Sequence, residues 1–79
     1  MPTTHVEALN LAREGKWDEA HTLIQSYSDK NGCLIHGYLH RVEGDLSNAS
    51  YWYRRAGETM PGNTLDEELN RLTAIAGSE

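Results

Sequence analysis

Apolar residues recur at helical spacing along most of this chain, and no stretch shows the strict alternation of a strand. In residues 17–27 and again in 46–57, small and large apolar side chains stand at positions i, i+3, i+4 and i+7. This spacing places them on one face of a helix. We therefore expect an all-α fold of five short antiparallel helices, beginning near residues 5, 17, 33, 46 and 64.

Residues that favour the start or the end of a helix lie between these segments. Thr4 with Glu7, and Thr64 with Glu67, form the capping-box pattern, in which each side chain satisfies a backbone N–H at the start of a helix. Turn signals stand at Gly15, Asn31-Gly32, Gly44-Asp45 and Gly77.

The size of the chain limits how such helices are stabilised. A chain of 79 residues forms one domain, residues 1–79, with a thin core, and small domains usually rely on disulfides, a metal or a partner. Cys33 is the only cysteine, which excludes an internal disulfide and a four-cysteine zinc site, and we expect it in the core. The remaining sources of stability are close helix packing, a histidine-bound metal or oligomerisation.

Charge and hydropathy exclude several classes of partner. The net charge of −5 opposes binding to nucleic-acid phosphates. No apolar run approaches the ~18 residues of a membrane span, and the N-terminus lacks a secretory signal pattern. Phosphate loops, dinucleotide fingerprints and nucleophile elbows are also absent from the sequence. We expect a cytoplasmic protein with no nucleic-acid or membrane partner, no cofactor and no catalytic residues.

The first two helical segments resemble the next two at a period of 29 residues. The segment Glu14-Gly15-Lys16-Trp17-Asp18-Glu19-Ala20 aligns with Glu43-Gly44-Asp45-Leu46-Ser47-Asn48-Ala49. Ala8 then aligns with Gly37, Ile24 with Tyr53 and Tyr27 with Ala56. Helical repeats of this length indicate stacked helix hairpins, with the small residues allowing close approach of the two helices.

These motifs resemble the tetratricopeptide repeat (TPR), which opens its second helix with a Gly-Asp/Lys-aromatic-x-x-Ala segment. The resemblance covers residues 4–61 and implies hairpins at about 4–30 and 32–57, with a capping helix at about 64–77 over the second hairpin. It also implies a protein or peptide partner, held along a wall built by the first helix of each hairpin. This first-helix wall would comprise Leu9, Arg13, Leu34, Tyr38 and Arg41, unless the last helix or a second subunit covers it.

Aromatic and basic residues supply the candidate partner-binding positions. Tyr51 and Arg55 share an outer helix face with Arg54 beside them, whereas Trp52 and Tyr53 turn toward the core. Arginine and tyrosine are common anchors at protein interfaces. The candidates are Tyr38, Arg41, Tyr51, Arg54 and Arg55. Alternatively, Arg54 or Arg55 pairs within the chain with Glu43, Asp45 or the acidic start of the last helix.

A second candidate site consists of His36, His40 and Glu43, at positions i, i+4 and i+7 of one helix. This spacing can bring two imidazoles and a carboxylate to one metal ion. In the structural alternative, both histidines lie hydrogen-bonded in the seam between two helices. His5 and His21 have no partner pattern, and we expect them at the surface.

Three functions follow from these patterns. The first is a non-catalytic protein-interaction module, and the second is a small metal-binding protein or enzyme centred on His36, His40 and Glu43. The third is a structural homodimer, in which the partner is a second copy of the chain.

Overall fold

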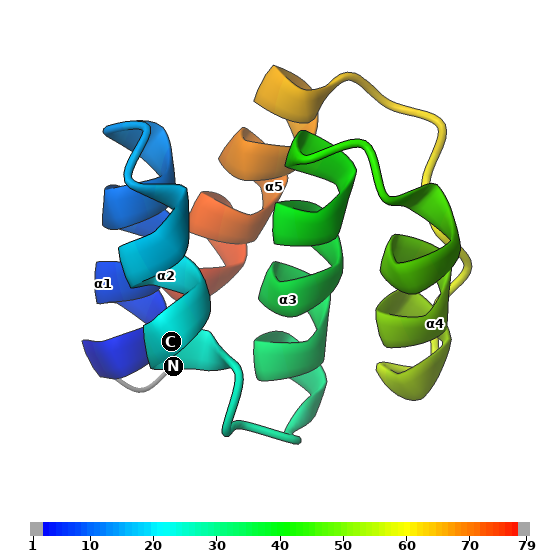
Figure 1. The fold of residues 1–79 in the computed structure, drawn as a ribbon, viewed down its shortest axis with the longest axis horizontal. Coiled ribbons are helices and arrows are strands. Elements are labelled where there is room, and N and C mark those ends of the chain that lie inside the picture. Colours follow the sequence, from blue (N-terminus) through cyan, green and yellow to red (C-terminus); the bar gives the residue numbers. More distant parts are fainter. Residues whose placement is uncertain (1–2, 78–79) are drawn as a thin grey trace.

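Five helices fill residues 3–77, the part of the chain that the structure, a computed structural model, describes. They are α1 (Thr3–Arg13), α2 (Trp17–Ile24), α3 (Lys30–Val42), α4 (Leu46–Arg55) and α5 (Leu65–Gly77). Figure 1 shows α1 and α2 at one side, α3 in the middle and α4 at the other side. The predicted all-α class and its five helices are confirmed. Within residues 3–77 no helix is long and apolar enough to cross a membrane.

The same turn closes α1 and α3 at the predicted interval. Gly15 (φ 80°) and Gly44 (φ 84°) follow these helices in the left-handed region, which glycine enters at little cost. After α1, Lys16 N–H donates to the carbonyl of Leu11 at 2.9 Å, and Gly15 N–H donates to Ala12 at 3.1 Å. After α3, Asp45 donates to His40 and Gly44 to Arg41 at 2.9 and 3.0 Å. Both turns are Schellman motifs, and the turn after α4 at Gly57 (φ 83°) has the same hydrogen-bond pattern.

Small residues let the helices of each hairpin approach closely. Ala8 and Ala20 are completely buried in the first hairpin, as is Ala49 in the second. A Cβ atom on Gly37 would stand 2.8 Å from the Tyr53 ring and 3.2 Å from the Ala49 carbonyl oxygen. Only glycine therefore fits between α3 and α4 at this distance.

Two local predictions differ from the structure at helix starts. Asn31 and Gly32 lie inside α3, which begins at Lys30, because Asp29 caps the helix and its carboxylate accepts a hydrogen bond from Gly32 N–H at 3.2 Å. Thr4 lies within α1, where its hydroxyl accepts a hydrogen bond from Tyr27. The second capping box is confirmed. The Thr64 amide donates to Glu67 at 2.8 Å, and the Glu67 amide donates to Thr64 at 3.1 Å.

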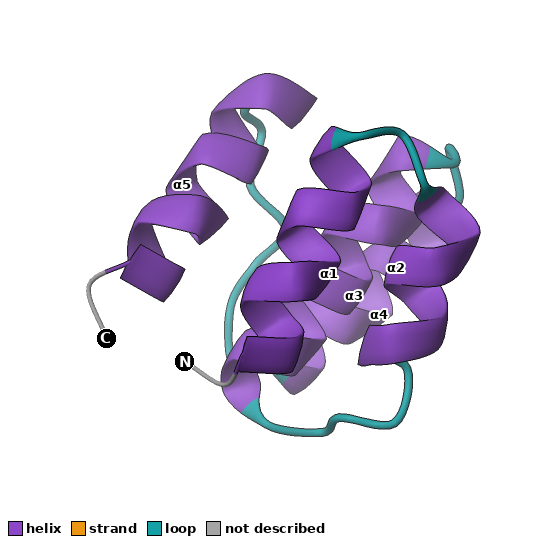
Figure 2. Cartoon of the chain, turned by 90° about the vertical axis from the view of Figure 1, so that its left-hand side faces the viewer, coloured by secondary structure: helices purple, strands orange, loops and turns teal. Residues whose placement is uncertain are grey.

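The last helix packs against the first helix of each hairpin. The backbone of α5 lies beside α1 and α3, the first helices of both hairpins, and Figure 2 shows it flanking the four-helix body. Arg13 on α1 donates to Asn70 at 3.4 Å and to Thr73 at 3.2 Å on α5. The fifth helix therefore lies along the first-helix wall, which was one of the alternatives for that wall, and it contacts the second hairpin through α3.

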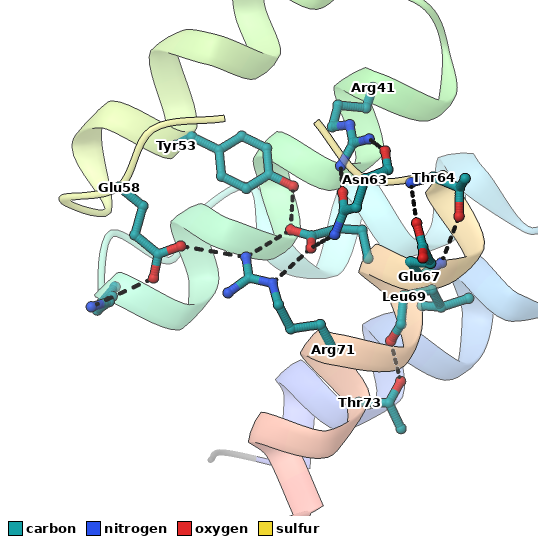
Figure 3. A network of polar contacts seen from close by, with 11 residues as sticks. Arg41, Tyr53, Glu58, Asn63, Thr64, Glu67, Leu69, Arg71 and Thr73 are labelled. Carbon is teal, nitrogen blue, oxygen red and sulfur yellow. Dashed lines mark hydrogen bonds and ion pairs between the residues drawn. The ribbon is translucent and has the colours of Figure 1, made fainter. Parts of the chain in front are cut away.

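A buried carboxylate anchors α5 to α4 and to the preceding loop (Figure 3). Glu68 is completely buried and accepts hydrogen bonds from Tyr53 Oη at 2.6 Å and from Asn63 Nδ2 at 2.9 Å. Arg71 donates to it through Nε at 2.7 Å and Nη2 at 2.8 Å. The contacts from Tyr53 and Asn63, which lie outside α5, fix the rotation of this helix about its own axis, and Arg71 on α5 itself balances the buried charge.

Candidate metal centre

Two of the five candidate partner-binding residues are used inside the chain. Tyr38 is only 5% exposed, so the expectation that it faces outward is wrong. Arg41 donates to the side-chain and backbone oxygens of Asn63, at 2.9 and 2.5 Å, and thereby holds the loop that leads into α5. Both side chains lie on the α3 face that α5 covers.

Tyr51, Arg54 and Arg55 remain exposed on α4. The Arg55 guanidinium carbon lies 4.9 Å from the Trp52 ring centre and 5.9 Å from that of Tyr51. Within residues 3–77, neither arginine forms an ion pair, so the predicted pairing with Glu43, Asp45 or the start of α5 is wrong. The acidic start of α5 binds Arg71 instead.

Three imidazoles meet where α2 faces α3. His36 and His40 lie one turn apart on α3, with exposed fractions of 4% and 7%, and His21 reaches them from α2. The Nε2 atoms of His21 and His36 are 3.1 Å apart. Potential ligand atoms of all three residues lie within 4.8 Å of one another.

His21 is partly exposed, and it completes this group, although no partner was expected for it. The sequence feature that could have revealed this position is the i, i+4 spacing of Trp17 and His21, which places them on one face of α2. This face lies beside the one formed by Ala20 and Ile24, which packs in the core. Trp17 Nε1 donates to the Leu39 carbonyl oxygen at 2.6 Å, which turns this face of α2 toward α3.

Glu43 supports the group from outside. Its carboxylate accepts a hydrogen bond from Nδ1 of His40 at 2.5 Å, which leaves Nε2 of that ring for a ligand. A carboxylate bound to the far nitrogen of a histidine fixes the tautomer and raises the basicity of the other nitrogen. Glu43 thus contacts His40 beside the three imidazoles, and with His40 and Asp45 it also forms a second group whose potential ligand atoms lie within 4.8 Å of one another.

Both tryptophans of the chain stack against the group. The Trp17 ring lies on His21 with centroids 4.8 Å apart and planes 9° apart, and Trp52 lies on His36 at 3.8 Å and 12°. These flat contacts restrict the rotation of two imidazoles and exclude water from one side of each.

The surroundings keep two of the rings neutral. Burial, then the neighbouring rings of His21 and His40 and the charge of Arg55, lower the pKa of His36 to about 4. Burial and then His40 lower the pKa of His21, against the opposite effect of Glu43 and Asp18. Near pH 7 both imidazoles therefore carry a free lone pair, the form that binds a metal ion.

The fourth histidine is separate from this group. His5 was expected at the surface but is completely buried, and its Nε2 donates to the Asp29 carboxylate at 2.9 Å. Because Asp29 also caps α3, this contact ties the start of α1 to the start of α3. Cys33 is buried as expected, and burial raises the pKa of its thiol.

Comparisons with known proteins found no matching family model, no similar curated protein and no similar solved structure.

Proposed function

We propose that this protein binds one divalent transition-metal ion, with Zn²⁺ as the leading candidate, through His21, His36 and His40. The convergence of three imidazoles from two helices within 4.8 Å carries the proposal. Neutral imidazole nitrogen suits zinc, copper, nickel and iron, whereas calcium and magnesium prefer oxygen ligands.

The distances fit a tetrahedral ion. Zinc–nitrogen bonds of 2.0–2.1 Å at tetrahedral angles separate two ligand atoms by about 3.3 Å. The Nε2 atoms of His21 and His36 already stand 3.1 Å apart, where they share one hydrogen bond. An ion held between them would require the proton of that hydrogen bond to move to Nδ1 of its own ring, and His40 would supply the third nitrogen.

Three protein ligands leave the fourth tetrahedral position for water or another small ligand, as in catalytic rather than structural zinc sites. His21 is partly exposed, which gives an ion a route from solvent. Within this site Glu43 acts as the positioning residue for His40.

Titration of untagged, chelator-treated protein with Zn²⁺ tests the proposal, with stoichiometry measured by elemental analysis after dialysis. We expect one ion per chain. Titration with Cu²⁺ should quench the tryptophan fluorescence, because both tryptophans contact ligand imidazoles. An ion present at 100 times its dissociation constant should also raise the free energy of unfolding by about 2.7 kcal/mol.

Two variants separate a built site from adventitious binding. His21→Ala removes the ligand from α2 and should abolish stoichiometric binding, whereas the neighbouring exposed Thr22→Ala should retain it. Glu43→Gln should keep the stoichiometry and weaken the affinity about 10- to 100-fold, as loss of such an outer contact does. Equal zinc binding by wild type and His21→Ala would contradict the proposal, as would sub-stoichiometric zinc that leaves stability unchanged.

A further inference from the structure

We infer that this chain associates head to tail with copies of itself, the outer face of α4 in one copy docking into an acidic hollow between α1 and α2 of the next. This contact does not depend on the metal centre. It rests on the complementary surfaces that the two ends of the molecule present.

The first surface is a hollow of about 350 Å³ on the hairpin α1–α2. Its apolar part consists of Leu11 and Leu23, and its rim carries the carboxylates of Glu7, Asp18 and Glu19. Within residues 3–77 none of these three carboxylates has a cationic partner, and no basic side chain lines the hollow. The hollow therefore suits an apolar group that arrives with positive charge.

The second surface is the outer face of α4, formed by Tyr51, Arg54 and Arg55. The tyrosine is 47% exposed, and both arginines are exposed. The carboxylates nearest along the chain are already engaged. Asp45 caps α4 by accepting a hydrogen bond from the Asn48 amide. Glu43 binds His40, and Glu58 binds Lys30 and Arg71. This face therefore offers an aromatic ring for the apolar part of the hollow and two arginines, without carboxylate partners in residues 3–77, for its acidic rim.

The hairpin that carries the hollow and the helix α4 lie at opposite ends of the helix row (Figure 1). On α2 the face toward α3 carries Trp17 and His21, and the hollow uses Glu19 and Leu23, about half a turn away. On α4 the buried Tyr53 faces the interior, and Tyr51 is again about half a turn away. A contact between them is heterologous, because each copy uses a different surface and keeps the other free for a further copy.

A small contact of this kind is weak and depends on charge. Interfaces below about 1,200 Å² are typical of transient complexes. We expect a dissociation constant on the order of 0.1 mM, and weaker association at about 0.5 M than at about 0.1 M salt, because salt screens exposed charges.

Sedimentation of the untagged wild-type chain over a concentration series tests this, with EDTA present so that metal cannot bridge surface groups. The weight-average mass should rise from the 8.9 kDa of one chain toward twice that value near 0.1 mM protein, and the added salt should reverse the rise. A monomer throughout the series at low salt overturns the proposal.

Charge reversal identifies the surfaces. Glu19→Lys in the hollow and Arg54→Glu on α4 should each abolish association alone, and an equal mixture of the two should restore it. The matched controls are Glu14→Lys and Lys16→Glu, which make the same charge changes at exposed positions outside both surfaces. If either single variant associates as strongly as the wild type, the head-to-tail contact is overturned, and a symmetric dimer that uses one surface is indicated instead. A mixture of the two variants that stays monomeric also overturns it.

Discussion

Replacing the buried carboxylate of Glu68 by an amide tests how α5 is held. The carboxylate accepts four hydrogen bonds, from Tyr53, Asn63 and the two nitrogens of Arg71 (Figure 3). In Glu68→Gln one oxygen remains and the other becomes an NH₂ group that faces donors. The variant keeps the shape of the side chain and loses its charge and two of its acceptor contacts.

The pKa gives the magnitude of this loss. Burial raises the pKa of Glu68, but hydrogen bonds from Arg71, Asn63 and Tyr53 outweigh burial and lower it from 4.5 to about 2. A difference of about 2.5 units corresponds to about 3 kcal/mol of stability at neutral pH. Two lost hydrogen bonds to a charged acceptor, at about 1.5–3 kcal/mol each, lead to a similar figure.

A loss of about 3 kcal/mol is large for a chain of this length, whose total stability is on the order of 4–12 kcal/mol. We expect the melting temperature of Glu68→Gln to fall by on the order of 15 °C at pH 7. Thermal unfolding followed by circular dichroism measures this. The adjacent Glu67→Gln is the matched control, because glutamine also completes a capping box, and it should melt close to the wild type.

The pH dependence provides an independent test. The pKa of Glu68 is lower in the folded than in the unfolded chain, so its contribution is complete above about pH 4.5 and is lost as the pH falls toward 2. The difference in unfolding free energy between wild type and Glu68→Gln should therefore shrink over this range, while effects of the other carboxylates cancel. A constant difference from pH 7 to pH 3, or equal melting temperatures at pH 7, would refute the reasoning.

Two further predictions concern the helix contacts. Gly37→Ala should destabilise the chain by about 1–3 kcal/mol in urea unfolding, because the added methyl group meets Tyr53, whereas Gly62→Ala, which meets no atom within 4 Å, should stay near wild type. Equal midpoints for the two would contradict the close approach of α3 and α4. Asp29→Ala should cost about 2–3 kcal/mol through loss of the α3 cap and of the acceptor for buried His5, and Asp29→Asn should cost less because asparagine also caps helices. Identical losses would show that the cap contributes nothing measurable.

Features determined by neighbouring residues could be predicted from the sequence. The capping box of Thr64 and Glu67 and the glycine turns at 15 and 44 depend on atoms only a few positions apart. The start of α3 was misplaced because an Asn-Gly pair is a turn signal, yet Asp29 immediately upstream supplies a helix cap. In that case two local sequence signals favoured different structures, and the helix cap determined where α3 begins.

Features that depend on how helices face one another were missed. The sequence places His36 and His40 on one line, but nothing local shows that His21 meets them, since this requires the rotation of α2 about its axis. Trp17 fixes that rotation through its bond to Leu39, a residue more than twenty positions away. His5 was misplaced for the same reason, because its partner Asp29 belongs to another helix.

The position of α5 bears most directly on where partners can bind. An amphipathic helix tethered by a short loop is present at a high effective concentration, so it occupies an apolar wall of its own chain ahead of a free peptide. Arg13 and Arg41, both expected on that wall, bind α5 and the loop before it. Since Tyr38 is covered as well, the candidate partner-binding residues that remain exposed are those on α4, Tyr51, Arg54 and Arg55. The association that we infer would accordingly use the two ends of the helix row, where α4 and the hairpin with the acidic hollow lie.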